Sequence, residues 1–258
     1  MDSVLISIIT VTYNAAQELP PTLASVEAQR MRCFEHIIVD GASTDGTVAL
    51  ANDYARRQTD VHTTVVSEPD RGLYDAMNKG LHRAVGRYVV FLNAGDRLHD
   101  ANTLQAVANA AGKGNVEDGP AVVYGQTDIV DTEGRYLHPR HLSAPGRLTF
   151  GSFRQGMLVC HQSFYARRDL CPDYDLKYRF SADYDWCVRI LRQASRLRLD
   201  TADTHCVLTD YLDGGMTVKN HRASLRERFR IMAHHYGWLP TAAMHVWFAL
   251  RNLFRNVK

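Results

Sequence analysis

The first 95 residues alternate between short apolar runs and amphipathic segments, and this alternation restricts the fold more than any other feature of the chain. Four runs rich in Ile and Val have the length of buried strands, at residues 5–12, 36–40, 61–67 and 88–92. Three segments between them repeat apolar residues at helical spacing, at residues 18–29, 48–57 and 73–84. Strict alternation of strand and helix is typical of a parallel sheet with helices on both faces. We therefore predict a doubly wound α/β fold.

The pattern is less regular after residue 100. We predict helices at residues 103–111 and 182–193, and two helices from residue 224 onward that are separated at Gly237 and Pro240. We predict short strands at residues 121–124, 127–130, 196–202 and 206–208, the last two as edge strands. The arginine-rich residues 135–155 are interpreted as a loop.

Composition restricts the class of protein and its partners. A chain of 258 residues that is 45% hydrophobic can bury a full core, which favours one large domain, or one domain with a C-terminal appendage, over two independent domains. A net charge of +2 without a basic run gives no reason to expect a nucleic-acid partner. Five scattered cysteines without a C-x-x-C pair indicate reduced thiols and a cytoplasmic setting. We expect neither a signal peptide, because the first strand begins close to Met1, nor a membrane span.

Polar residues follow each of the four predicted strands. Tyr13 comes after the first, Asp40 ends the second, Asp70 and Arg71 come after the third, and the stretch from Asn93 to Asp96 follows the fourth. Because parallel strands end at one edge of a sheet, we expect these residues in one cleft. A ring can stack on a base, an arginine can bind phosphate oxygens, and a carboxylate can hold a divalent cation. The set predicts a site for a nucleoside diphosphate.

Each of these residues also has an ordinary structural interpretation. Tyr13 can be a core aromatic, Asp40 and residues 93–96 can be turn residues, and Arg71 can be a solvated charge. However, we expect all four strands to end at the same edge of the sheet. Four polar strand ends at one edge favour a ligand site over four unrelated structural roles. The sequence contains neither a G-x-x-x-x-G-K-[ST] loop nor a G-x-G-x-x-G turn after a strand, which argues against P-loop NTPases and dinucleotide dehydrogenases.

Four segments resemble those of a known family: IITVTYN at residues 8–14, VDGASTDGT at 39–47, EPDRG at 68–72 and FLNAGD at 91–96. In this order and spacing they are similar to the family 2 glycosyltransferases, and a weaker match continues to about residue 217. The resemblance implies the GT-A fold, with a mostly parallel, Rossmann-like sheet flanked by helices. Residues 1–100 would bind the nucleotide sugar, residues 101–217 the acceptor, and residues 218–258 would form a helical appendage.

The same resemblance implies transfer of a sugar, with inversion, from a nucleoside-diphosphate sugar, usually UDP-linked, to an acceptor hydroxyl. Tyr13 would stack on the base, Asp40 would bond the uracil or an equivalent ring, and Arg71 lies in a loop that contacts the donor. The full set of implied binding residues is Thr10, Tyr13, Asn14, Asp40, Arg71, Asn93, Asp96 and His161.

The resemblance also implies a metal, Mg²⁺ or Mn²⁺, held by Asp96 at the last carboxylate position of the family's D-x-D region. Many members read Asp-Ala-Asp-Asp where this chain reads Asn-Ala-Gly-Asp at residues 93–96, and fewer anionic ligands mean weaker divalent binding. The Asn-x-Gly-Asp form is similar to that of a bacterial branch that assembles surface polysaccharides. Asp213, in a segment that resembles a closing loop (YLDGGMT, residues 211–217), would be a further metal ligand.

The segment FSADYDW at residues 180–186 resembles the family's catalytic segment and implies that Asp183 is the general base. An Asp at a helix start can instead be a capping residue. His161, in GMLVCHQS at residues 156–163, would face the acceptor or be a satisfied core histidine. Two other classes remain open. A nucleotidyltransferase would need a Gly-rich basic loop where this chain has Thr12 to Ala15, and a non-catalytic nucleotide-sugar binding protein would not need Asp183.

The acceptor side is less defined. The arginines of residues 135–154 can bind an acceptor phosphate, such as the pyrophosphate of a lipid carrier, or can form a solvated basic loop. The last predicted helix, residues 242–257, has apolar and basic residues. It can lie on an anionic membrane, or pack on the domain or on another subunit. The expected acceptor is thus a saccharide or lipid-linked saccharide, with the enzyme cytoplasmic or peripheral at the inner face of the cell membrane.

Overall fold

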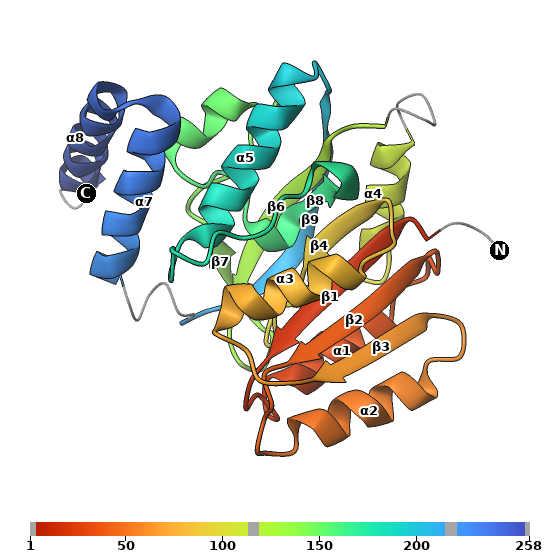
Figure 1. Ribbon diagram of the computed structural model, residues 1–258. Coiled ribbons are helices and arrows are strands. Elements are labelled where there is room, and N and C mark those ends of the chain that lie inside the picture. The colour runs from red at the N-terminus through yellow and green to blue at the C-terminus, as the bar shows by residue number, and fades with distance from the viewer. Residues whose placement is uncertain (1–3, 113–118, 215–220, 256–258) are drawn as a thin grey trace.

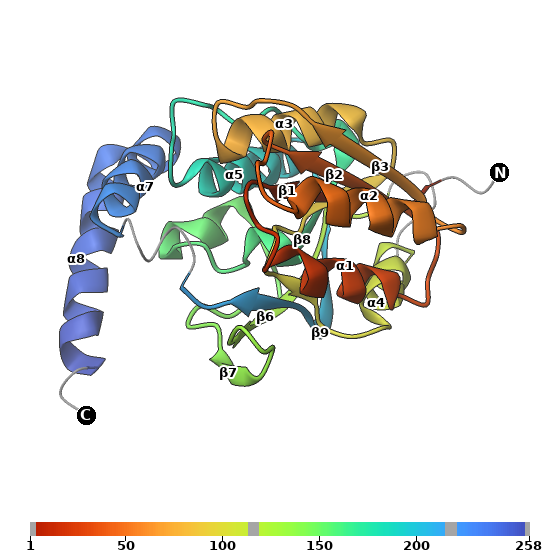
Figure 2. The ribbon, with the colours of Figure 1, turned by 90° about the horizontal axis from the view of Figure 1, so that it is seen from below.

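The computed structural model describes residues 4–112, 119–214 and 221–255, and shows one sheet with helices on both faces (Figures 1 and 2). The first half contains β1 (Ile6–Thr12), α1 (Leu19–Glu27), β2 (Phe34–Asp40), α2 (Thr47–Arg57), β3 (His62–Ser67), α3 (Leu73–Arg83) and β4 (Tyr88–Phe91). The second half contains β5 (Arg97–Leu98), α4 (Thr103–Ala111), β6 (Val122–Val130), β7 (Tyr136–Pro139), η1 (Phe150–Gln155), η2 (His161–Ser163), β8 (Phe164–Arg167), η3 (Arg168–Leu170), α5 (Ala182–Arg196) and β9 (Thr201–Leu212). Two helices follow, α7 (His221–Tyr236) and α8 (Trp238–Arg255).

The sheet has the order β3-β2-β1-β4-β8-β6-β9-β5, with β7 paired to β6. Strands β1 to β4 are parallel to one another, and β8 joins them antiparallel to both β4 and β6. The register pairs Thr12 with Asp40, and Asp40 with Ser67, so β1, β2 and β3 end level with one another. The predicted α/β class and mostly parallel sheet are confirmed.

The apolar runs of the first half are explained by burial on both faces of the sheet. On β1, Ile9 and Val11 belong to the core formed with α3 and α5, whereas Ile6 and Ile8 face the core formed with α1 and α4. Figure 2 shows these helices on opposite sides of the sheet. A strand buried on both faces contains a continuous apolar run instead of an alternating one. These strands could therefore be predicted from the sequence.

The predicted strands of the second half were wrong in number and position. The pairs expected at residues 121–124 and 127–130, and at 196–202 and 206–208, are two single strands, β6 and β9. Moreover, β9 lies between β6 and β5 and is not an edge strand. The register between β6 and β9 shifts around Gln126, and His205 has a φ of 58°, so both strands are irregular at mid-length. These irregularities break the apolar pattern and make each strand read as two.

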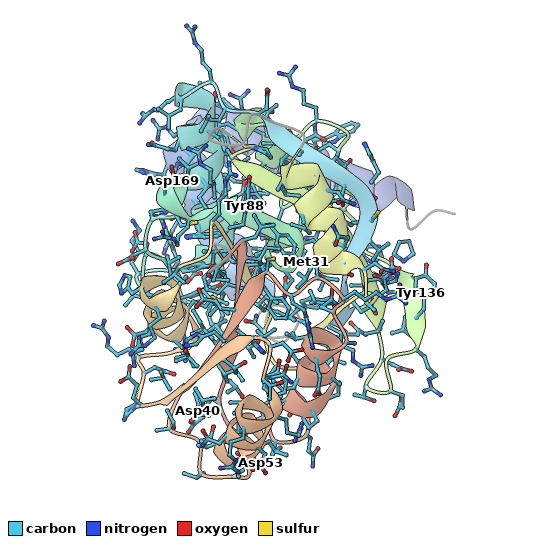
Figure 3. All side chains as sticks on the ribbon, turned by 90° about the vertical axis from the view of Figure 1, so that its right-hand side faces the viewer. Met31, Asp40, Asp53, Tyr88, Tyr136 and Asp169 are labelled. Atoms are coloured by element: carbon cyan, nitrogen blue, oxygen red, sulfur yellow. The ribbon has the colours of Figure 1, made fainter. Side chains whose placement is uncertain are left out.

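The interpretation of residues 135–155 as a loop was also wrong, since this stretch contains β7 and η1. Its arginines are accompanied by Leu148 and Phe153, which are buried in the core with α5. By contrast, the side chains of β7 are exposed: Tyr136 projects outward in Figure 3, whereas Tyr88 on β4 lies inside the molecule.

The C-terminal helices break at Gly237 alone. Gly237 has a φ of 91°, which favours glycine, and Pro240 lies in the first turn of α8, where its missing N–H is not needed. The helix predicted at 242–257 therefore begins four residues earlier, and residues 256–257 lie outside the described part. Among the described residues, no helix has both the length and the apolarity to cross a bilayer.

Burial of His36 on β2 makes the stability of the fold depend on pH. The ring accepts or donates hydrogen bonds with Thr10 Oγ1 at 2.9 Å and Tyr54 Oη at 3.1 Å, and burial lowers its pKa to about 3. Unfolded, the ring regains its ordinary pKa of about 6.5 and binds a proton more readily. Its contribution to stability is therefore complete above pH 6.5 and is lost as the pH falls toward 3.

We expect the free energy of unfolding to fall by about 2 kcal/mol from pH 7 to pH 5 because of His36 alone. Urea unfolding at both pH values measures the loss. His36→Gln should reduce the difference between the two pH values, whereas His62→Gln, at an exposed position on β3, should leave it unchanged. An equal pH dependence in wild type and His36→Gln would contradict the assignment.

Candidate active site

A pocket of about 580 Å³ opens at the carboxyl ends of β1 and β4. This edge of an open α/β sheet is where ligands bind, because the loops that leave the strands diverge there. The sequence-predicted residues that line it are Tyr13, Asn93, Asp96, His161, Asp183 and Asp213. Asp70, a predicted strand-end residue that was given no role, lines it as well. So do four residues that were not predicted: Thr12, Tyr74, Gln162 and Tyr211.

Two buried polar atoms of this lining have no hydrogen-bond partner within the described part of the chain: Thr12 Oγ1 and Asn93 Oδ1. Most buried polar atoms of a folded protein are hydrogen-bonded, and an unsatisfied one costs free energy. Both atoms therefore indicate a pocket that is completed by a polar ligand. Tyr13 adds a ring that is 64% exposed at the same strand end.

Asp183 stands in the first turn of α5 and is held from two sides. Its Oδ1 accepts a hydrogen bond from the Tyr74 hydroxyl at 3.1 Å, and its Oδ2 lies 3.3 Å from His161 Nδ1. Burial acts to raise its pKa, but the hydrogen bond and charge of His161, together with the charge of Arg228, outweigh it and hold the pKa below the ordinary value. Asp183 is therefore ionised at neutral pH. The N-cap position of α5 is Ser181, so Asp183 is not the capping residue.

His161 connects Asp183 to the strand end of β4. Its Nε2 lies 3.5 Å from the Asn93 side-chain nitrogen, on the opposite side of the ring from Asp183. Nδ1–H can donate to Asp183, and in a neutral ring Nε2 can then accept from the Asn93 amide. His161 is 8% exposed and lines the pocket, so it is a buried histidine that also faces the ligand space.

Asp96 is buried at the base of the pocket, and both of its oxygens accept hydrogen bonds from the second half of the chain. Oδ2 accepts from Gln162 Nε2 at 2.7 Å, and Oδ1 accepts from the backbone N–H of Leu212 at 3.1 Å. Burial raises the pKa of Asp96 to about 6 despite these bonds. Gly95 has a φ of 101°, and a Cβ there would lie 2.8 Å from Leu212 Cδ2, so only glycine allows this turn.

Oxygen atoms suited to a divalent cation are present in the pocket. Asn93, Asp96 and Asp213 all line it, and Asp213 is exposed at the mouth with Oδ1 accepting from the Gly214 N–H. Amide and carboxylate oxygens are the ligands that Mg²⁺ and Mn²⁺ prefer, so the residues fit the cation. Residues 215–217 of the predicted closing loop lie outside the described part of the chain.

A second group of possible metal ligands lies on β6, on β9 and directly after β5. One ligand atom from each of His99, Asp128 and Asp210 lies within 4.8 Å of the others. His99 Nδ1 is 2.7 Å from Asp210 Oδ1, and this hydrogen bond raises the pKa of His99. The described lining of the pocket includes none of the three.

Two of the predicted binding residues, Thr10 and Asn14, lie outside the described pocket lining. Thr10 is fully buried and bonded to His36, on the face of β1 away from α3. Asn14 has a φ of 46°, and its Oδ1 accepts from the Thr44 N–H at 2.9 Å while its own N–H donates to Ser43 Oγ. It thereby ties the loop after β1 to the loop after β2.

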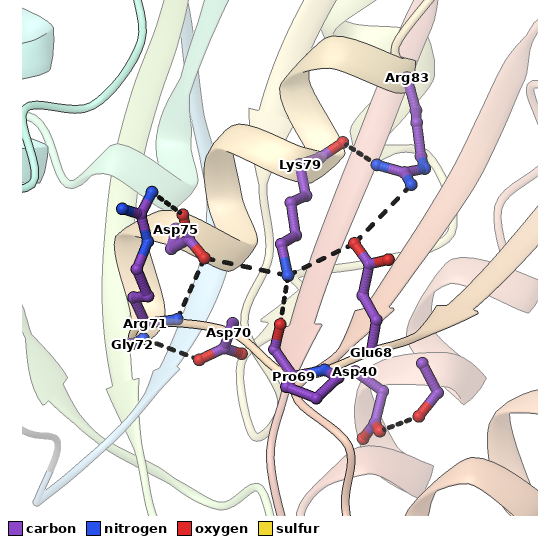
Figure 4. A network of polar contacts seen from close by, with 10 residues as sticks. Asp40, Glu68, Pro69, Asp70, Arg71, Gly72, Asp75, Lys79 and Arg83 are labelled. Atoms are coloured by element: carbon purple, nitrogen blue, oxygen red, sulfur yellow. Dashed lines mark hydrogen bonds and ion pairs between the residues drawn. The ribbon is translucent and has the colours of Figure 1, made fainter.

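Asp40 and Arg71 are likewise outside the described pocket lining. Asp40 is fully buried, and its carboxylate accepts from the Ser43 N–H at 2.9 Å and from Ser67 Oγ at 2.7 Å. The Arg71 side chain is 78% exposed and turns toward Asp75 on α3, at 3.0 Å (Figure 4).

The neighbouring Asp70 takes the pocket position instead. A Cβ on Gly41 would lie 2.4 Å from Asp70 Oδ2 and 3.3 Å from the Tyr13 ring, so the absence of a side chain at Gly41 leaves room for both. The signal for Asp70 was its place in the EPDRG segment, one residue before Arg71.

Comparisons with known proteins give the same family that the sequence motifs resemble. The family model described as Glycosyl transferase family 2 matches residues 7–174. A PGL/p-HBAD biosynthesis glycosyltransferase of Mycobacterium tuberculosis (strain ATCC 25177 / H37Ra) is 35% identical over 218 residues, which cover 83% of this chain and 79% of the relative. The putative teichuronic acid biosynthesis glycosyltransferase TuaG of Bacillus subtilis (strain 168) is 41% identical over 93 residues, 36% of each chain.

Solved structures share the fold at low identity. S. aureus TarS 1-349 superposes with a TM-score of 0.67 at 16% identity, over 97% of this chain and 74% of that one. The mannosyltransferase PcManGT from Pyrobaculum calidifontis, in complex with GDP-Man and Mn²⁺, superposes with a TM-score of 0.61 at 21% identity, over 95% of this chain and 75% of that one.

Proposed function

Because the chain belongs to glycosyl transferase family 2 and is a glycosyltransferase with the GT-A fold, we propose that it moves a sugar from a nucleoside-diphosphate sugar, a UDP-sugar first of all, to an acceptor hydroxyl with inversion. One observation carries the proposal: an exposed ring, unsatisfied polar atoms and an ionised carboxylate meet in one pocket at the strand ends. TarS has been solved with UDP-GlcNAc and PcManGT with GDP-Man, which supports a nucleotide-sugar donor.

In this proposal the donor's base stacks on Tyr13, and Asp70 accepts a hydrogen bond from the base or ribose. Asp40 acts indirectly, because its carboxylate fixes the loop after β2 through hydrogen bonds from Ser43 and Ser67. Thr12 Oγ1 and Asn93 Oδ1 bind polar atoms of the donor or of its cation. With the donor bound in this way, its sugar would lie on the side of the pocket that Asp183 lines.

Asp183 then removes the proton from the acceptor hydroxyl as that oxygen attacks the anomeric carbon. A carboxylate that stays ionised at neutral pH is ready to accept this proton, and the hydrogen bonds from Tyr74 and His161 keep it in place. A single displacement of this kind inverts the anomeric centre. Asn93, Asp96 and Asp213 would hold a Mg²⁺ or Mn²⁺, which when bound supplies Lewis-acid stabilisation of the departing diphosphate.

For the acceptor we propose a lipid-linked saccharide of cell-surface glycan synthesis, with the enzyme cytoplasmic or peripheral at the inner membrane face. The mycobacterial relative is named for PGL/p-HBAD biosynthesis and TuaG for teichuronic acid biosynthesis, which supports this class of acceptor. Residues 101–217 would bind it, residues 1–100 the donor, and residues 218–258 remain an appendage. Membership of the glycosyltransferase family argues against the two alternatives, a nucleotidyltransferase and a non-catalytic binding protein.

Thermal unfolding with a panel of nucleotide sugars, with and without Mn²⁺, tests the donor. A ligand at 100 times its Kd stabilises the native state by about 2.7 kcal/mol, which corresponds to a rise in Tm of roughly 5–10 °C for a chain of this size. We expect a UDP-sugar to give this rise and Tyr13→Ala to lose most of it, whereas Tyr136→Ala, also exposed but on β7, keeps it. If no nucleotide sugar raises Tm, the proposal fails.

A further inference from the structure

The C-terminal helices differ in charge from the rest of the chain. Residues 221–258 contain seven Lys and Arg residues and a single acid, Glu227, which is a formal net charge of +6. The whole chain carries only +2, so the preceding 220 residues carry −4. The positive charge is therefore concentrated on α7, α8 and the last residues of the chain.

The outer side of α8 is apolar and exposed. Trp238, Leu239, Val246 and Trp247 are 64%, 75%, 61% and 56% exposed, and Ala243 between them is exposed as well. Residues 239, 243, 246 and 247 follow helical spacing and share one side of the helix. The opposite side packs on the protein through Met244 and Phe248, and Figure 2 shows α8 at the outer edge of the molecule. Over residues 238–248, packing on the domain thus uses one side of α8 and leaves the other side exposed.

α7, which packs against α8 through the contact of Phe229 with His245, adds positive charge. Arg222, Arg226 and Arg230 are exposed and recur every four residues, so they form one stripe along the helix. On the described parts of α7 and α8 no acidic side chain is exposed. Glu227 is half-buried, because its two oxygens accept the backbone N–H groups of Arg179 and Phe180 at 2.9 and 2.8 Å.

We propose that this α7–α8 surface, defined by Arg222, Arg226, Arg230, Leu239, Val246 and Trp247, binds the surface of an anionic lipid bilayer. Tryptophan and aliphatic side chains enter the boundary between headgroups and acyl chains, and arginines contact the anionic headgroups. A second copy of the chain fits this surface less well, since symmetric pairing would bring two arginine stripes together.

The surface is connected directly to the acceptor side of the pocket. Glu227 holds the backbone at Phe180, which lines the pocket, and Ser181 Oγ lies 3.0 Å from Ser224 Oγ of α7. The next residues lead to Asp183. Membrane binding would therefore place the catalytic carboxylate near the lipid surface, where a lipid-linked acceptor presents its hydroxyl; this part of the inference rests on the proposed function.

Co-sedimentation of the full chain with vesicles tests the surface. We expect binding to vesicles of phosphatidylcholine with 30% phosphatidylglycerol, weakened by salt, and little binding to phosphatidylcholine alone. The variant Arg222→Gln/Arg226→Gln/Arg230→Gln should bind the anionic vesicles on the order of 100-fold more weakly, and Val246→Ser/Trp247→Ser at least about tenfold more weakly.

Matched controls change similar residues elsewhere. Arg56→Gln/Arg57→Gln/Arg196→Gln removes three other exposed arginines, and Tyr136→Ser/Leu137→Ser removes an exposed apolar pair on β7; both should bind as wild type does. Donor-induced thermal stabilisation should be the same in all four variants, which shows that they fold and separates membrane binding from the donor site. Equal binding to neutral and anionic vesicles, or no binding, would overturn the proposal. So would a wild-type dimer in light scattering that Val246→Ser/Trp247→Ser converts to monomer.

Discussion

Replacing Asp183 by Asn should reduce sugar transfer on the order of 10³-fold while donor binding survives. The carboxamide has nearly the shape of the carboxylate but cannot take a proton from the acceptor hydroxyl. It can still accept the hydrogen bond of Tyr74 or of His161, so the pocket keeps its form. The measurement is kcat for transfer to a saccharide acceptor, beside the thermal shift produced by the donor.

Asp185, two residues further along α5, provides a matched control. Its carboxylate is buried and pairs with Arg189 at 2.7 Å and with His235 at 2.8 Å, away from the described lining of the pocket. We expect Asp185→Asn to lower Tm and leave kcat per folded molecule nearly unchanged, which is the reverse of Asp183→Asn. Transfer that continues near the wild-type rate in Asp183→Asn would refute the general-base assignment. Such a result would also reopen the possibility that another group activates the acceptor.

Replacing Asp96 by Asn should lower transfer by about 10²-fold and abolish the extra donor stabilisation that Mn²⁺ provides. Both oxygens of Asp96 face hydrogen-bond donors, Gln162 Nε2 and the Leu212 N–H. An amide must turn its own NH₂ toward one of these donors, and it lacks the negative charge that holds a cation. Donor titrations with and without Mn²⁺, followed by thermal unfolding, measure the loss.

The raised pKa of Asp96 adds a pH test. With a pKa of about 6 the group is ionised above pH 6 and increasingly neutral below it, so the Mn²⁺-dependent part of donor binding should fall as the pH drops from 7 to 5. Asp213→Asn should have the smaller effect because that side chain is exposed, and His99→Ala reports on the second group of ligands. An unchanged Mn²⁺ response in Asp96→Asn would exclude Asp96 as the main ligand.

The first half of the fold could be predicted because its strands are buried on both faces and its helices have one apolar side. The second half could not, since its pairing is non-local and irregular. The short strands β5 and β8 were missed, and β9 reads as two strands because Thr204 and His205 interrupt its apolar pattern at the register shift. Hydrogen bonding to β6, which no local pattern reports, makes β9 one strand.

The residues of the site, like the fold, could be predicted only in part. Six of the residues predicted from the strand-end rule and the family resemblance line one pocket, from Tyr13 after β1 to Asp213 after β9. The rule does not say which side of a strand end a side chain takes, and Asp40 turns into its own loop. Gln162 was missed although it follows His161, and Asp70 was predicted only as a strand-end residue without a role. Their roles depend on contacts between distant segments, such as that of Gln162 with Asp96.

That last contact, together with the Leu212 N–H, means that a carboxylate from residues 1–100 is oriented by atoms from residues 101–217. The two halves share one continuous sheet through β4 and β8, so the spacing between Asp96 and Asp183 is set when the chain folds. Neither half is a module that could be excised or exchanged and still present its share of the chemistry. Natural variation in donor or acceptor preference should accordingly arise from substitutions in the loops around the pocket, and not from shuffling of whole halves.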